Sequence, residues 1–471
     1  MSRQPATEVA LDEEVARGFA ERTRGPVLLP GEPGYDDARA IFNGLIDRRP
    51  ALIVRCTGAA DVVEAVNFAR EQDLLLSIKG GGHGVAGSAV NDGGIVVDLS
   101  LMKGVRVDPA GRTVRAQGGA TWGDVDRETQ LFGLAVPGGL VSTTGIAGLT
   151  LHGGVGHLRR KHGLSLDNLV AVDIVTADGK LRTASATENE DLFWAVRGAG
   201  SNFGVITSFE FRAHPVGPMV MVAAPFYSLD DATTVLPAWR DFMATAPEEI
   251  SSLAVLWNVP ADEHFPPEHH EEAVLILASV YAGAVEEGER AMQPLRELAE
   301  PVLDLSEPWP WLGLQAGFDP YWPKGVLAYW KSRAFSELPQ AAIDEIADFA
   351  ARRPTRQSDI AIWHHGGAMS QVGETETAFG GRDTAFLVSA EATWTDPEQT
   401  EEAIAWARDA WDAMERHSTG GLYLNFPGFG EEKEALVKAG YGVNYERLAS
   451  LKSRYDPTNF FRMNLNITPA G

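Results

Sequence analysis

The residues best suited to chemistry lie at Lys79–Gly87, KGGGHGVAG, where one histidine, His83, stands inside a run of glycines. Glycine adopts backbone angles that other residues avoid, and it lets the main chain approach a ligand closely. The run therefore predicts a loop wrapped around a ligand, with His83 exposed to that ligand. The alternative is a structural histidine in a tight turn.

Gly82, Gly84 and Gly87 also complete a GxGxxG pattern, which is typical of dinucleotide-binding βαβ units. That pattern requires a strand before it and a helix after it, because the helix N-terminus holds the pyrophosphate. Here the following residues, Ser88–Gly94, are predicted as a turn, and Ile95–Leu99 as another buried strand. We therefore exclude this unit, and no strand–glycine–helix unit elsewhere favours a nicotinamide-dependent enzyme.

The elements that must position the loop form a mixed pattern of short strands and helices. Residues 57–73 have apolar residues near helical spacing and lead into a strand at Leu74–Ile78. Thr121 and Asp124 have the spacing of a helix capping box. Further strands are predicted at 95–99, 104–107, 113–116, 169–176 and 205–211, and a further helix at 189–196.

A second glycine-rich run extends from Pro137 to Gly163. Its glycine density is unfavourable for a helix, and it is too apolar for a disordered linker. It is predicted as a long, ordered loop that contacts a ligand.

After Pro215, amphipathic helices alternate with strands, as at 230–245, 286–298 and 398–416. This pattern indicates an antiparallel sheet covered on one side by helices. Trp239, Trp406 and Trp411 fall on the apolar faces of these helices and are expected in the core. The segment Tyr445–Ile467 is predicted as a helix followed by an extended piece rich in asparagine.

Composition excludes several classes of partner. The chain has 471 residues and a net charge of −25, which disfavours binding to nucleic acids or anionic membranes. Cys56 is the only cysteine, so no intramolecular disulfide forms, and no metal site is expected. Without a secretory signal or a membrane-spanning stretch, we expect a soluble, cytoplasmic protein of two domains, monomeric or homodimeric.

Together these motifs resemble one family. KGGGHGVAG, QGGATWGDVD, PGGLVSTTGIAGLTLHGGVGHLRRKHG, ENEDLFWAVRGAGSNFGV and the terminal YDPTNFFRMNLNI are similar to the FAD-linked oxidases of the vanillyl-alcohol oxidase superfamily, within its berberine-bridge-enzyme-like group. The resemblance implies an α+β fold with a split PCMH-type FAD-binding domain, made of residues 1–215 (core about 46–215) and 431–471. Residues 216–430 would form an inserted substrate domain of antiparallel sheet covered by helices.

The same resemblance assigns the cofactor site. In this family a histidine in the first glycine-rich loop bonds through a ring nitrogen to the 8α-methyl carbon of FAD, and His83 occupies that position. An imidazole is neutral and nucleophilic near pH 7, which suits this bond. Some relatives have a second, cysteinyl link to the flavin, but Val141 stands at the matching position, so a single link is expected.

The remaining positions implied for FAD are mostly backbone contacts, because amides in a nest can replace arginine clamps around a phosphate. Some of the glycines could serve turns instead. They are Lys79, Gly80, Gly81, Gly82, Gly84 and Gly87, then Gly118, Gly119, Gly138, Gly139, Thr143, Gly145, Gly148, Gly153 and Gly156, and finally Asn202, Gly204, Val205, Ile206, Asn464 and Asn466.

The flavin performs the redox step, while the protein must remove a proton from a substrate hydroxyl or amine. Two customary proton acceptors of relatives are missing, because Ser389 and Phe426 stand at their positions. The candidates that remain are Tyr329, Lys331, His365, Glu391 and Tyr423. Tyr423 could serve packing instead, Glu391 could be a surface ion pair, and neighbouring strand residues His364 and His365 cannot both line one site.

The resemblance thus predicts an FAD-dependent oxidase. A small alcohol, amine or secondary metabolite would give a hydride to the flavin, and O2 would reoxidise it with release of H2O2. A carbohydrate oxidase or a flavin dehydrogenase of the same fold is the alternative. A protein that binds flavin or ligand without turnover is the alternative of another class.

Overall fold

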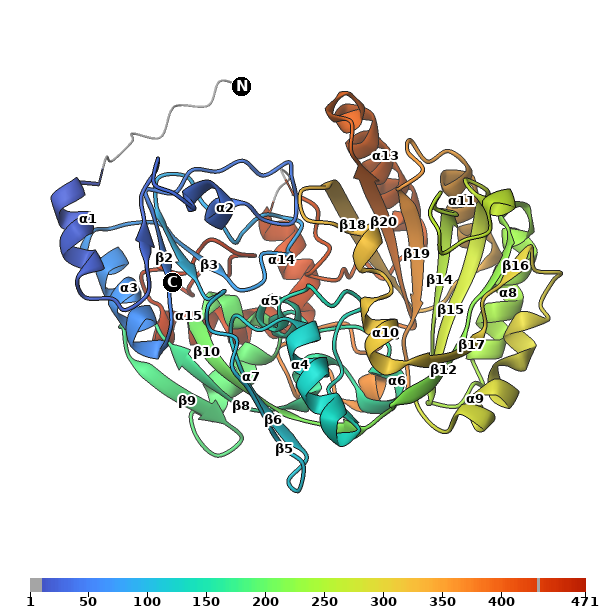
Figure 1. Cartoon of the computed structure of the whole chain (residues 1–471), viewed down its shortest axis with the longest axis horizontal. Helices are drawn as coiled ribbons and strands as arrows, with labels where there is room; N and C mark the ends of the chain where they lie inside the picture. The colour runs from blue at the N-terminus through green and yellow to red at the C-terminus, as the bar shows by residue number, and fades with distance from the viewer. Residues whose placement is uncertain (1–10, 430–432) are drawn as a thin grey trace.

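The N-terminal residues and the last part of the chain form one end of the molecule, and the residues between them form the other end (Figure 1). The computed structural model describes residues 11–429 and 433–471. The predicted junction at residues 430 and 431, like the first ten residues of the predicted FAD-binding domain, lies outside the described residues.

Two sheets build the N-terminal end. The first has the order β1, β2, β4, β3, with β4 parallel to both β2 and β3. The second has the order β5, β6, β10, β8, β9 and is antiparallel throughout. Their strands are β1 (Val27–Leu28), β2 (Leu52–Arg55), β3 (Leu76–Lys79), β4 (Ile95–Asp98), β5 (Val105–Asp108), β6 (Thr113–Gln117), β8 (Leu169–Val175), β9 (Leu181–Ser185) and β10 (Val205–Arg212).

The helices of this end agree with the predicted pattern at most positions. The capping box is confirmed, since Thr121 Oγ1 accepts from the Asp124 N–H and an Asp124 carboxylate oxygen accepts from the Thr121 N–H. The first helices are α1 (Glu13–Ala20), α2 (Tyr35–Arg39), α3 (Ala59–Glu71), α4 (Trp122–Thr129) and α7 (Glu190–Ala199). A two-stranded ladder of β7 (Leu134–Ala135) and β11 (His214–Pro215) lies beside them.

The second glycine-rich run is not wholly a loop, contrary to the prediction, but contains α5 (Ile146–Leu151) and α6 (Arg159–His162). Ile146, Ala147, Thr150 and Leu151 are buried on α5. Burial of this apolar face outweighs the low helix propensity of the surrounding glycines.

A nine-stranded sheet forms the other end, and all pairings within it are antiparallel. Seven strands follow the order β16, β13, β15, β14, β19, β20, β18, and β12 joins both β15 and β17. They are β12 (Met219–Ala223), β13 (Pro225–Ser228), β14 (Ile250–Asn258), β15 (Ala273–Tyr281), β16 (Leu303–Asp304), β17 (Glu307–Pro310), β18 (Leu327–Phe335), β19 (Asp359–His364) and β20 (Phe386–Trp394).

The two faces of this sheet differ in what they contact. Ala390 and Ala392 of β20 join a core with Trp406, Ala407 and Ala410 of α13. The residues between them point to the opposite face, because strand side chains alternate. The helices of this end are α8 (Ala232–Met243), α9 (Val285–Met292), α10 (Trp311–Ala316), α11 (Gln340–Ala351), α12 (Ala368–Gln371) and α13 (Thr400–Ala413).

The last described segment attaches to the N-terminal end of the molecule. It comprises α14 (Lys433–Tyr441), α15 (Tyr445–Tyr455) and an extended piece. Lys452 Nζ, fully buried, donates to Asp456 Oδ2 at 2.7 Å and to the carbonyl oxygens of Asn202 and Phe461. The Asn202 side chain accepts from the Ile467 N–H and donates to the Leu465 carbonyl. These bonds attach the terminal segment beside the start of β10.

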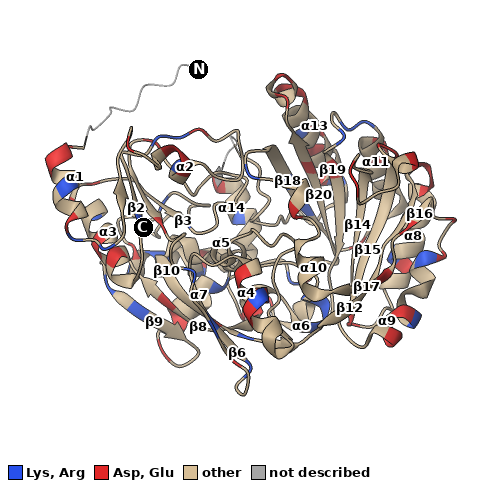
Figure 2. Ribbon diagram, viewed as in Figure 1, with Lys and Arg blue, Asp and Glu red and all other residues tan. Residues whose placement is uncertain are grey.

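Acidic residues occur on outer helices at both ends of the molecule, including α1, α9 and α11 (Figure 2). Among the described residues, none of the helices has the length and apolar character needed to span a lipid bilayer.

Candidate active site

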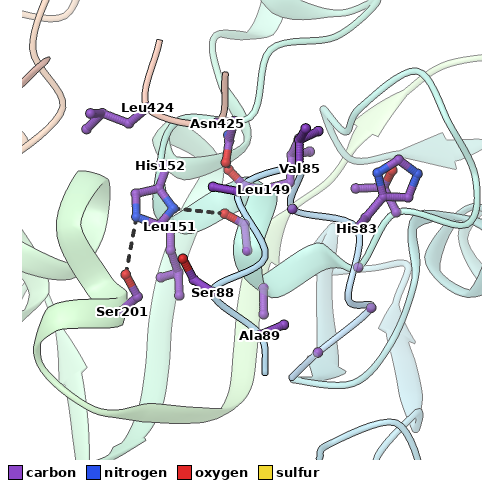
Figure 3. Close-up of a pocket in the computed structure, with 18 of the residues that line it drawn as sticks. His83, Val85, Ser88, Ala89, Leu149, Leu151, His152, Ser201, Leu424 and Asn425 are labelled. Carbon is purple, nitrogen blue, oxygen red and sulfur yellow. Dashed lines mark hydrogen bonds between the residues drawn. The ribbon is translucent and has the colours of Figure 1, made fainter. Parts of the chain in front are cut away.

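A cavity of about 290 Å³ lies between the glycine-rich loops and the face of the nine-stranded sheet that the helices do not cover. Figure 3 shows part of its lining, from the two glycine-rich loops to Leu424 and Asn425. One wall comes from the loop after β3, from α5 and from the terminal segment. The other wall comes from β18, β19, β20 and residues 423–427. The cavity therefore joins parts of the chain that are far apart in sequence.

His83 lies in the first wall with an unsatisfied ring nitrogen. Its ring stacks on Phe42, with centroids 4.1 Å apart, and lines the cavity. The buried Nε2 has no hydrogen-bond partner among the described residues. Burial lowers the pKa of His83 to about 4, so the imidazole is neutral at pH 7. A neutral, unpartnered nitrogen facing a cavity is suited to bonding with a ligand there.

The two glycine-rich loops meet at Gly81 and Gly145. A Cβ atom at Gly81 would lie 2.4 Å from the Gly145 nitrogen, and one at Gly145 would lie 2.4 Å from the Gly81 nitrogen. Only glycine therefore fits at either position, and the main chains of both loops are exposed to the cavity. This backbone cradle matches a ligand with phosphate groups, which amides can bind without a cationic side chain.

Thirteen of the positions that the sequence assigned to the cofactor line the cavity. They are Gly80, Gly81, Gly82, His83, Gly84, Gly87, Gly139, Val141, Gly145, Gly148, Gly204, Ile206 and Asn464.

The other ten positions lie outside the lining, and most have a packing role. A Cβ at Gly119 or Gly156 would lie 1.7 Å from the backbone of Leu99 or Gly138. A Cβ at Gly118, Gly138 or Gly153 would lie 2.3, 2.7 or 2.8 Å from its nearest neighbour, which is also too close. Thr143 is exposed, and Thr144 lines the cavity in its place. Lys79 Nζ donates to the Ala38 carbonyl. Asn202 binds the terminal segment, Val205 joins a core cluster, and Asn466 is also not part of the lining.

Glu391 lies on the sheet wall with its side chain in the cavity lining. Glu391 Oε1 accepts a hydrogen bond from Ser389 Oγ at 2.7 Å. Asp359 of β19 stands directly across from Glu391, so the two carboxyl groups share a face. Burial raises the pKa of Glu391 to about 7, and burial together with the neighbouring Glu391 raises the pKa of Asp359.

Tyr423 also lines the cavity, and its phenol oxygen accepts three hydrogen bonds. The donors are the Gly154 N–H at 3.1 Å, the Val155 N–H at 3.2 Å and Asn425 Nδ2 at 2.8 Å. Burial raises the pKa of Tyr423 above its usual value. The hydroxyl thus connects the second glycine-rich loop to residues 423–427.

Tyr329 and Lys331, both predicted as catalytic candidates, lie on the opposite face of the sheet. Tyr329 accepts from Arg408 Nε at 3.1 Å, and Lys331 Nζ lies 3.5 Å from the ring centroid of Trp411. Both partners belong to α13. The residue between them, Trp330, is the one that lines the cavity, because side chains of a strand alternate.

His365 is likewise absent from the cavity lining. Both of its ring nitrogens are buried without a hydrogen-bond partner in the described part of the chain. Burial and the nearby Arg159 lower its pKa well below the usual value. His364 packs between Trp239 and Phe386 on the helix side of the sheet.

Several cavity residues escaped the sequence prediction. His152 lies between the Gly148 carbonyl oxygen and Ser201 Oγ, with its ring nitrogens 3.2 Å from each (Figure 3). Trp322, Trp330 and Trp363 supply aromatic rings. The signal for His152 is present in the sequence, since LHGG repeats the pattern of a histidine among glycines. The tryptophans and Asp359 carry no comparable signal.

Comparison with known proteins agrees with this geometry. Residues 50–185 match a family model described as "FAD binding domain", and residues 422–468 match one described as "Berberine and berberine like". An FAD-linked oxidoreductase of Dictyostelium discoideum is 32% identical over 462 residues, covering 97% of each chain. The (R)-6-hydroxynicotine oxidase of Paenarthrobacter nicotinovorans is 32% identical over 464 residues, covering 95% of this chain and 97% of that protein.

The crystal structure of 6-hydroxy-D-nicotine oxidase from Arthrobacter nicotinovorans superposes with a TM-score of 0.83 at 30% identity, covering 95% of this chain and 98% of that one. The chain belongs to the berberine-bridge-enzyme-like group of the vanillyl-alcohol oxidase superfamily. It is an FAD-dependent oxidoreductase. The predicted superfamily, fold class and flavoprotein nature are therefore confirmed.

Proposed function

We propose that the protein is an oxidase whose FAD is linked covalently to His83 and which oxidises a small, largely apolar alcohol or amine. FAD in this cavity would accept the hydride and pass the electrons to O2, giving H2O2. The names of the nicotine oxidase relatives support an amine or a related small molecule as substrate.

The observation that carries this proposal is the unpartnered His83 Nε2. A buried polar atom without a partner is rare, because its desolvation costs about 1–3 kcal/mol. Its position beside the Gly81 and Gly145 backbones fits a flavin bonded at one end and held by amides at the phosphates. Val141 stands in the same lining and cannot form a second link.

Two of the predicted proton acceptors, Glu391 and Tyr423, line the cavity. We assign the role of proton acceptor to Glu391, because a base with a pKa of about 7 is matched to neutral pH. Tyr423 is less suitable because its pKa is raised and its oxygen already accepts three N–H groups. We assign it to holding the second glycine-rich loop.

Two measurements test this function. The purified protein is precipitated with acid, and the yellow colour should remain with the polypeptide, with the flavin mass on the peptide that contains His83. The holoprotein is then mixed with a panel of alcohols, amines and sugars under air, and H2O2 release is recorded.

The alternatives predict different results. A protein that only binds flavin would show no bleaching by any substrate under anaerobic conditions. A dehydrogenase would bleach under the same conditions but would reoxidise slowly in air and quickly with an artificial acceptor. Colour released wholly into the acid supernatant would contradict the link at His83.

A further inference from the structure

The cavity has an acidic group on its wall. Among the described residues that line it, Glu391 is the one carboxylic acid, and neither lysine nor arginine occurs. Asp359 stands behind Glu391 on the same face, and its Oδ2 is buried without a hydrogen-bond partner in the described structure. Two buried carboxyl groups side by side are costly unless a cation or a proton joins them.

The charged groups around this pair leave its cavity side open. Behind Asp359, Arg353 directs its guanidinium to the Ala350 carbonyl and to Asn258 Oδ1, and attracts Asp359 only at longer range. Within β20, Ser389 supplies a hydroxyl to Glu391. On β18, Lys331 points to the opposite face, toward Trp411. Across the cavity, Tyr423 is bonded to its three N–H donors.

An aromatic ring lies beside the carboxyl group. Trp330 of β18 is the direct cross-strand neighbour of Glu391, and its indole Nε1 donates to Thr393 Oγ1 at 3.2 Å. Trp363 lies on the same wall, but the Arg159 guanidinium already lies over it, 5.6 Å from the ring centroid.

Trp330 packs against Phe42 and Phe426, with ring centroids 5.8 and 5.3 Å away, but among the described residues no cationic side chain lies over its ring. Because a cation is attracted to the face of an indole, Trp330 rather than Trp363 is the ring on this wall without a cation already beside it.

We infer that the substrate is a cation, an amine that enters protonated and places its ammonium group between the Glu391 carboxylate and the Trp330 ring. This inference rests on the proposed oxidase function and specifies its substrate class. Asp359 is a positioning residue, which keeps a proton and so lets Glu391 carry the negative charge of the pair.

Oxidation of such an amine requires an acceptor for one proton and an acceptor for a hydride, which are Glu391 and the flavin. The ammonium N–H bond breaks and its proton forms an O–H bond on Glu391, which frees the nitrogen lone pair. Bound FAD would supply the two-electron oxidant: the adjacent carbon would give up its hydrogen with the bonding electron pair, and a carbon–nitrogen double bond would form. Water hydrolyses the resulting iminium cation to a carbonyl compound and an amine.

The test uses two probes of equal shape, choline and 3,3-dimethylbutan-1-ol, which differ only in charge. Binding to the holoprotein is followed without oxygen by tryptophan fluorescence and by calorimetry. We expect choline to bind at least about tenfold more tightly. At about pH 6, below its pKa, Glu391 is mostly protonated and must lose its proton to form an ion pair with choline. Choline has no ammonium proton of its own, so its binding should release about one proton, which comes from Glu391.

Two variants locate the effect. Glu391→Gln should abolish both the preference for choline and the proton release. Asp126→Asn is the matched control, since Asp126 is a buried carboxyl outside the cavity, bonded to Trp311 and Gln315, and it should leave both unchanged. Equal binding of the two probes, or a preference that persists in Glu391→Gln, would overturn the inference. If Glu391→Gln does not fold, absence of proton release by the wild-type protein overturns it.

The outcome separates this inference from the proposed function. A protein that oxidises neutral alcohols and binds both probes equally is an oxidase without the cation site. A protein that prefers choline but reduces its flavin with no alcohol or amine has the cation site without the oxidase function.

Discussion

The two walls of the cavity are built by different means. The wall of the first end includes two stretches of glycine backbone, which approach so closely at Gly81 and Gly145 that neither tolerates a Cβ atom. The wall of the second end is made of side chains on β18, β19 and β20, with Trp330, Trp363 and Glu391 projecting into the cavity. A wall of backbone can hold a constant cofactor, whereas a wall of side chains can change with the substrate.

The largest expected effect comes from changing the first wall at His83, whose buried ring nitrogen has no hydrogen-bond partner among the described residues. His83→Ala removes the unpartnered imidazole, so no flavin should remain attached after acid precipitation. The measurement is the absorbance of the precipitate and the mass of the peptide around residue 83. Attachment that survives this change would place the bond elsewhere.

The next effect tests the second wall. Glu391→Gln removes the proposed base without changing its size, and we expect the rate of anaerobic flavin reduction to fall by about 10²–10⁴. The attached flavin should be retained, because Glu391 belongs to the other wall. A reduction rate near the wild-type value would remove Glu391 from the mechanism.

The protonation of Glu391 predicts a pH dependence of rate and stability. Since its pKa is raised from 4.5 to about 7, the reduction rate should increase as pH rises through about 7. Between about pH 4.5 and 7, the folded protein keeps a proton on Glu391 that the unfolded chain has already released. The stabilisation of the folded state by this proton is therefore fully present below about pH 4.5 and is lost as pH rises through about 7. The melting temperature of Glu391→Gln should therefore fall less between pH 5 and 8 than that of the wild type.

A smaller effect is expected where the two glycine-rich loops touch. Gly81→Ala places a methyl group 2.4 Å from the Gly145 backbone nitrogen, which cannot move as a side chain could. We expect a loss of stability of about 1–3 kcal/mol and a lower flavin content. Gly18→Ala on α1 is the control, because its Cβ would meet no atom within 4 Å. Equal behaviour of the two variants would contradict the close contact.

The smallest effect on rate is expected on the far face of the sheet. Tyr329→Phe removes a hydroxyl that accepts from Arg408, which should cost about 1 kcal/mol of stability and leave flavin reduction near the wild-type rate. Stopped-flow reduction and thermal unfolding measure the two quantities. A large fall in the reduction rate would mean that Tyr329 acts in the cavity after all.

The same contrast explains what could be predicted from the sequence. Glycine indicates a backbone requirement directly, so the amino-acid sequence alone predicts the ligand-binding loops around His83 and Gly145. The distinction between glycines that line the cavity and those that pack, such as Gly119, could not be made, because both need a position without a side chain.

The sheet wall was harder to predict because its content depends on register. In the segment LAYWKS we predicted Tyr329 and Lys331 as catalytic candidates, whereas the residue that lines the cavity is Trp330, between them. A shift of one residue reverses the face on which a strand side chain lies, and the sequence alone does not fix that register. Asp359 was missed for a related reason, since its partnership with Glu391 arises from the pairing of two strands 32 positions apart.

The bond between Asn202 and the Ile467 N–H spans 265 residues. Because Asn464 and Leu465 of the same segment line the cavity, its first wall is incomplete until the ribosome has translated that stretch. We therefore expect flavin loading to follow translation rather than accompany it, and a nascent chain stalled before residue 445 should stay colourless even with abundant FAD.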